Sequence, residues 1–157
     1  MSISYGLAAQ SDVEELKRLR AAYLTADFGE VDKDVMEGII AELAPFFERH
    51  LGKDFFAHVA WADGVAVGTC WLLLTEKPAS VAFPHGKTAA IFNVYVDPAF
   101  RKRGIARQLM LNLIQQATDL GLDRLELRAT AMGYNLYRSI GFVDDESSHR
   151  AMNYRIG

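Results

Sequence analysis

The apolar positions of the chain repeat with a helical period most clearly in its second half. Ile105, Leu109, Leu113, Ala117 and Leu120 recur every three or four residues, and Gly121 follows them as a helix stop. This pattern predicts a helix over about 105–120. The same reading along the chain predicts further helices beginning at Ser11, over 33–50 with an interruption near Pro45, and over 133–140.

Alternating and short apolar runs predict the strands. Asp63-Gly64 is a hairpin signal between two such runs, and Asp97-Pro98 ends another. The loop 76–88 contains two prolines and no period. The expected strands are 3–8, 55–62, 65–75, 89–96, 125–128, 142–145 and 150–156.

This order of elements predicts the fold class. Helices alternate with groups of strands, which favours a mixed, mostly antiparallel sheet with helices on both faces, an α+β (three-layer α/β) fold. The length of 157 residues is that of one domain, so we expect residues 1–157 to form a single unit.

Composition narrows the choice of function. The net charge of −3 does not favour a nucleic-acid binder, so no nucleic-acid partner is expected. Cys70 is the only cysteine, and the four histidines lack ligand spacing, so neither a disulfide nor a metal site is expected. No membrane segment or secretory signal is visible, which predicts a cytoplasmic protein.

A basic turn stands where a strand meets the periodic helix. The helix N-terminus carries partial positive charge and unpaired N–H groups, yet Arg101, Lys102, Arg103 and Arg107 gather there. Each cation at that end costs an isolated helix a few tenths to about 1 kcal/mol. A bound polyanion would reverse the sign of the interaction, and Gly104 would let it approach the backbone. The alternative is a solvated basic turn.

Two motifs in this region resemble those of the GNAT N-acetyltransferase superfamily. Arg101, Gly104 and Ala106 are similar to its acetyl-CoA signature, Gln/Arg-x-x-Gly-x-Gly/Ala. The run Leu136-Tyr-Arg-Ser-Ile-Gly-Phe142 is similar to its Leu-Tyr-x-x-x-Gly-Phe motif. The predicted order of elements also matches the GNAT fold.

The resemblance implies how acetyl-CoA would be held as co-substrate. Backbone amides of the turn and first helical turn would bind its pyrophosphate, with Arg101 beside them. The preceding strand would bind the pantetheine arm. Counting back seven residues from Tyr137 gives Thr130 where many members have an anchoring Asn. The implied cofactor-binding residues are Val94, Tyr95, Val96, Arg101, Lys102, Arg103, Gly104, Ile105, Ala106, Arg107 and Thr130.

The resemblance also implies catalytic residues. Tyr137 would protonate the departing thiolate, with Tyr134 as the substitute, and a main-chain N–H near Val94 would stabilise the oxyanion. Glu126 matches a base used in some relatives, although a surface strand glutamate is the alternative. Asn93 is polar within an apolar strand and would position the amine or a water.

The expected function is transfer of an acetyl group from acetyl-CoA directly to a primary amine of an unidentified acceptor. The alternative is a catalytically weak CoA-binding sensor or regulatory module of the same fold. Residues 27–48 hold seven acids against one base, which would attract a cationic amine unless they form a solvated helix face. We expect an amine acceptor and no membrane partner, and allow for a homodimer.

Overall fold

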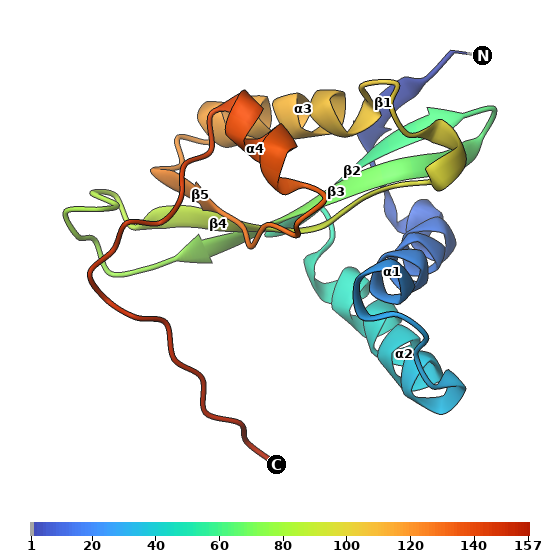
Figure 1. Cartoon of the computed structure of the whole chain (residues 1–157), viewed down its shortest axis with the longest axis horizontal. Coiled ribbons are helices and arrows are strands. Elements are labelled where there is room, and N and C mark those ends of the chain that lie inside the picture. Colours follow the sequence, from blue (N-terminus) through green and yellow to red (C-terminus); the bar gives the residue numbers. More distant parts are fainter. Residues whose placement is uncertain (1) are drawn as a thin grey trace.

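The computed structural model describes residues 2–157 and contains one five-stranded sheet in the order β1-β2-β3-β4-β5 (Figure 1). The first four strands pair antiparallel, and β5 is parallel to β4. The predicted mixed, mostly antiparallel sheet is therefore confirmed. The strands are β1 (Ser4–Leu7), β2 (Phe55–Ala62), β3 (Val65–Glu76), β4 (Lys87–Val96) and β5 (Arg124–Glu126).

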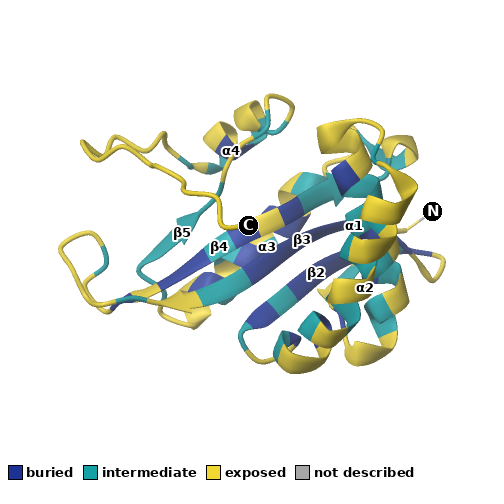
Figure 2. Ribbon diagram, turned by 90° about the horizontal axis from the view of Figure 1, so that it is seen from below, coloured by how far each residue is buried: buried dark blue, intermediate teal, exposed yellow. Residues whose placement is uncertain are grey.

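Helices cover both faces of this sheet. Helices α1 (Val13–Phe28) and α2 (Lys33–His50) lie on one face, and α3 (Ile105–Asp119) and α4 (Tyr134–Ile140) lie on the other (Figure 1). Each face has its own apolar core. Leu109 and Leu113 of α3 anchor one core, and Leu16, Leu19 and Phe47 anchor the other; all five are fully buried. Figure 2 shows that buried positions are concentrated in the central strands.

Two local predictions near the N-terminus are wrong. Residues Gln10–Asp12 form a short 3₁₀ turn, and the Ala9 N–H donates to Asp12 Oδ2 at 2.8 Å, so the α-helix predicted to begin at Ser11 begins at Val13. Pro45 lies within an unbroken α2, where the expected interruption is absent.

The two strands expected after α4 are also absent from the described residues. Residues 143–157 are exposed throughout and belong to no strand, and the C-terminal segment extends away from the sheet (Figure 1). Asp144 is instead bonded to the Tyr134 hydroxyl, and Asp145 pairs with Arg124 at 3.7 Å. The alternation of Met152, Tyr154 and Ile156 satisfies a strand pattern, but a strand forms only where a neighbouring edge supplies hydrogen bonds.

Candidate active site

The turn between β4 and α3 presents a row of unpaired backbone donors. Lys102 and Gly104 adopt left-handed conformations, with φ of 64° and 76°, and Gly104 is the residue before α3. Within residues 2–157, the N–H groups of residues 102–107 have no hydrogen-bond acceptor. Successive N–H groups at such a turn form an anion-binding concavity, and the helix dipole adds to it.

The cations of this turn have no carboxylate partner among the described residues. Arg101 Nε donates to the Val96 carbonyl at 3.0 Å, and its guanidinium lies over the Tyr95 ring at 5.7 Å. Arg103 donates weakly to the Ala99 carbonyl, and Arg107 donates to Ser139 Oγ at 3.1 Å. Because the positive charge here is uncompensated, the turn has the composition of a polyanion site, and a pyrophosphate fits it.

The sheet opens directly beside this turn. The parallel pairing of β4 and β5 covers only Thr88 with Arg124, Ala89 with Leu125 and Ala90 with Glu126. Beyond Ala90, the edge of β4 that faces β5 has no partner strand within residues 2–157. Main-chain groups along 91–96 can therefore bind an extended, amide-bearing ligand such as a pantetheine arm. The residues present fit acetyl-CoA at both places.

A β-bulge lies in the part of β4 that pairs with β3 but has no β5 partner. Trp71 pairs with Phe92 and Thr69 pairs with Tyr95, so Asn93 and Val94 together stand opposite Cys70. Asn93 has a φ of 51°, a left-handed conformation that costs about 1–3 kcal/mol in a non-glycine residue and is often found at functional sites. The bulge thus includes Val94, whose N–H is the group expected to stabilise the oxyanion.

Asn93 is fixed by α1. Its side chain is 2% exposed, and its Oδ1 accepts a hydrogen bond from Arg20 Nη1 at 3.1 Å. The Arg20 guanidinium lies over the rings of Trp71, at 5.5 Å, and Tyr23, at 5.9 Å. Asn93 Nδ2 and Arg20 Nε are buried without a partner in the described residues. One unsatisfied donor of the bulge and one of α1 therefore lie where the bulge meets that helix.

Tyr137 lies on the opposite side of the same region. It is 7% exposed, and burial, reinforced by the nearby Tyr23 and Cys70, raises the pKa of its phenol to about 12. Within residues 2–157 its hydroxyl makes no hydrogen bond. A Cβ atom on Gly133 would stand 2.8 Å from the Tyr137 ring and 3.0 Å from its hydroxyl. Gly133 therefore leaves the space that the phenol occupies.

The other predicted residues have definite local contacts. The Tyr134 hydroxyl donates to Asp144 at 2.9 Å, so it is committed away from β4. Thr130 Oγ1 accepts the Gly133 N–H at 3.2 Å and begins the turn into α4. Glu126 accepts from Lys77 Nζ at 3.3 Å and pairs with Arg124 at 3.7 Å. Its strand neighbours Leu125 and Leu127 pack toward α3, so Glu126 faces the α1 side.

The acidic run in residues 27–48 is a solvated helix surface. All seven acids are exposed; Asp32 caps α2, and Glu37 lies 3.9 Å from Lys33. Cys70 is fully buried, and burial raises the pKa of its thiol, which makes it an unreactive packing residue.

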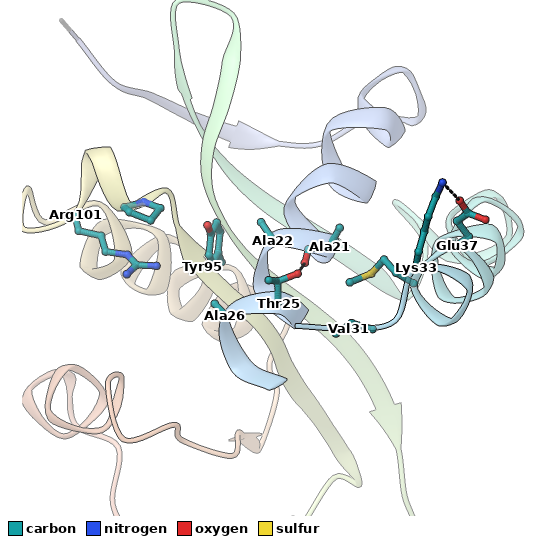
Figure 3. Close-up of a pocket in the computed structure, with 11 residues that line it drawn as sticks. Ala21, Ala22, Thr25, Ala26, Val31, Lys33, Glu37, Tyr95 and Arg101 are labelled. Atoms are coloured by element: carbon teal, nitrogen blue, oxygen red, sulfur yellow. Dashed lines mark hydrogen bonds and ion pairs between the residues drawn. The ribbon is translucent and has the colours of Figure 1, made fainter. Parts of the chain in front are cut away.

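An open hollow of about 750 Å³ lies around the exposed face of α1. Tyr95 and Arg101 line it on one side of α1, and Lys33 and Glu37 line it on the other (Figure 3). It does not include Tyr137, Asn93 or Glu126. The hollow thus adjoins the basic turn but is not the opening between β4 and β5.

The described residues also bear on two other features, a membrane-spanning helix and a metal site. No helix among residues 2–157 has the length and apolarity needed to cross a bilayer. No group of three or more His, Cys, Asp or Glu side chains in the same residues is arranged to hold a metal ion.

The chain matches the acetyltransferase (GNAT) family over residues 14–142 and belongs to that family. A [ribosomal protein bS18]-alanine N-acetyltransferase of Haemophilus ducreyi is 34% identical over 109 residues, which are 61% of this chain and 75% of that protein. The protein is thus an acyl-CoA-dependent N-acetyltransferase, with acetyl-CoA as co-substrate.

Solved structures agree with this fold. A predicted acetyltransferase of Clostridium acetobutylicum, solved with acetyl-CoA, has a TM-score of 0.86 at 23% identity, covering 97% of this chain and 96% of the other. A ribosomal-protein-alanine N-acetyltransferase of Brucella melitensis biovar Abortus 2308 has a TM-score of 0.73 at 23% identity, covering 99% of this chain and all of the other.

Sequence reasoning missed Arg20 and the bulge. Arg20 follows Leu16 by one helical turn, so it lies on the apolar face of α1, and a charged residue on that face was the available signal. The bulge has no comparable signal, because an Asn within an apolar run does not by itself indicate an extra residue in a strand.

Proposed function

We propose that the protein transfers the acetyl group of acetyl-CoA directly to a primary amine, without a covalent enzyme intermediate. The observation that carries this proposal is the convergence on one stretch of β4 of an unpaired strand edge, a bulge and an unpartnered phenol. Cys70, the cysteine opposite this stretch, is fully buried, and burial raises the pKa of its thiol, so it does not serve as a covalent nucleophile. In the reaction, a C–N bond forms as the C–S bond breaks.

The roles of the residues follow from their positions. The Val94 N–H donates to the carbonyl oxygen as negative charge develops on it. Tyr137 donates to the departing sulfur. With a pKa of about 12, this phenol is a weaker acid than a thiol near 8.5, so complete proton transfer would cost about 5 kcal/mol. Tyr137 therefore acts mainly as a hydrogen-bond donor to the thiolate. The CoA thiolate takes its proton from solvent after release, and this balances the proton that the amine loses on the other side of the sheet.

Proton removal from the amine is assigned to the α1 side of the sheet. Glu126 faces that side, but it pairs with Ala90, three residues and roughly 10 Å along β4 from Asn93. A water between them can relay the proton to Glu126, while Asn93 orients the amine. The relative from Haemophilus ducreyi is named for an alanine of ribosomal protein bS18, so an amine of a protein is one candidate acceptor here.

The test is release of CoA from acetyl-CoA with a panel of amines, run beside a thermal-shift measurement with acetyl-CoA alone. The proposal expects CoA release with at least one amine and a raised melting temperature, since a ligand at 100 times its Kd adds about 2.7 kcal/mol of stability. Binding of acetyl-CoA with no transfer to any amine would favour the alternative function, a CoA-binding sensor or regulatory module of the same fold. Absence of both effects would contradict the acetyl-CoA site.

A further inference from the structure

Arg20 is a cation without an anion. It is only partly exposed, and within residues 2–157 no carboxylate lies within 4 Å of its guanidinium. Its hydrogen bond goes to the neutral amide of Asn93, and its other neighbours are aromatic rings. Burial accordingly lowers its pKa. A partly buried charge is normally paired, because losing water around it costs free energy that neutral partners only partly return.

The other cations of α1 are paired, which makes Arg20 an exception on its own helix. Lys17 bonds to Glu14 at 3.0 Å, and Arg18 bonds to Glu15 at 2.7 Å. The acid further along the helix, Asp27, is seven residues from Arg20, about 10 Å along the axis. Charge balance at Arg20 thus requires a group that this part of the chain does not supply.

The position of Arg20 indicates that the missing anion belongs to the acceptor substrate. Arg20 bonds to Asn93, the residue before Val94, whose N–H is assigned to the reacting carbonyl in the proposed function. It stands on the α1 side of the sheet, from which the amine approaches, while the basic turn at the start of α3 serves the phosphates. A planar guanidinium pairs well with a carboxylate through parallel hydrogen bonds. An acceptor that places its amine beside Val94 would place a carboxylate near Arg20.

We propose that the acceptor is a small molecule that carries a carboxylate close to its reactive amine, of the amino-acid class, and that Arg20 binds this carboxylate. The proposal rests on the proposed acetyl transfer and names its substrate class. An extended peptide N-terminus, whose first carboxyl group is an amide, does not supply the charge.

The experiment compares acceptors in matched sets: an amino acid, its primary amide and its decarboxylated amine, for the common amino acids. For the wild type, we expect kcat/KM for the best amino acid to exceed that for both neutralised partners by at least tenfold. Arg20→Met keeps much of the side-chain stem and should reduce this preference to less than threefold, with acetyl-CoA affinity retained. Lys17→Met removes a charge from the same helix and should keep the preference.

A second measurement does not depend on turnover. With CoA present, N-acetyl amino acids should raise the melting temperature of the wild type more than their amides do, and Arg20→Met should abolish the difference. If amines are acetylated without any preference for the carboxylate, or if the preference survives in Arg20→Met, the inference is wrong while the acetyl transfer stands. If no amine is acetylated and no N-acetyl amino acid shifts the melting temperature, both are wrong.

Discussion

The hydroxyl of Tyr137 can be removed without breaking a hydrogen bond of the fold, because it makes none within residues 2–157. Tyr137→Phe keeps the buried ring, so the melting temperature and acetyl-CoA affinity should stay nearly constant. The turnover rate should fall by at most about 10²- to 10³-fold, the usual effect of removing one hydrogen-bond donor from a group on which charge develops.

Tyr134→Phe is the matched control for this measurement. Its hydroxyl bonds to Asp144, so this change should lower stability slightly and leave the rate per folded molecule unchanged. A Tyr137→Phe enzyme with wild-type turnover would show that another group, such as a water, donates to the thiolate.

Gly133 is expected to position Tyr137 without taking part in chemistry. Its φ of −87° and ψ of −17° are helical and suit alanine, so the effect of Gly133→Ala comes from the contact of the new methyl with the phenol. We expect kcat to fall by at least tenfold, with KM for acetyl-CoA little changed. In a Tyr137→Phe background the same substitution should lower kcat by less than threefold. An equal loss in both backgrounds would mean that Gly133 acts through packing alone.

At the scale of elements, the left-handed backbone of the turn before α3 is expected to be required for acetyl-CoA binding. Gly104→Ala places a methyl at φ 76° where no protein atom lies within 4 Å, so the methyl points into the space beside the unpaired N–H groups. A left-handed alanine costs about 1–2 kcal/mol and shifts the backbone away from this geometry. Acetyl-CoA affinity, measured by titration calorimetry, should fall by at least tenfold.

Gly121→Ala provides the comparison, because Gly121 has a φ of 69° and equally open surroundings after α3. The two variants should lose similar stability, and only Gly104→Ala should lose affinity. Equal acetyl-CoA affinity in the two folded variants would mean that the turn is a solvated basic loop and does not bind the pyrophosphate.

The elements show why the sequence predicted some features and missed others. The helix over 105–119 was predictable because its own period creates the buried face that α3 packs on the sheet. The absence of a strand at 150–156 was not predictable, because the alternation of apolar residues is local while strand pairing depends on an edge distant in the sequence. The motifs likewise located Tyr137 and the turn, whereas the Arg20–Asn93 contact joins residues 73 positions apart, which no local pattern encodes.

At the scale of the whole molecule, His58 links the sheet to α3 and makes stability depend on pH. Its ring is 7% exposed in β2, and Nε2 lies 2.7 Å from Gln116 Oε1 of α3. Burial lowers its pKa below the ordinary 6.5, although the bond to Gln116 acts in the opposite direction. The unfolded chain therefore binds a proton at this site more readily than the folded chain does.

The sign of the effect follows from this difference. Stability from neutral His58 is present above pH 6.5 and is lost as the pH falls through the lowered folded pKa. We expect the free energy of unfolding, measured by urea denaturation, to decrease from pH 7.5 to pH 5. His58→Gln should flatten this slope whatever its own stability, and His149→Gln, at an exposed histidine, should keep it. An unchanged slope in His58→Gln would assign the acid sensitivity to other groups and show that the β2–α3 contact tolerates a charged imidazole.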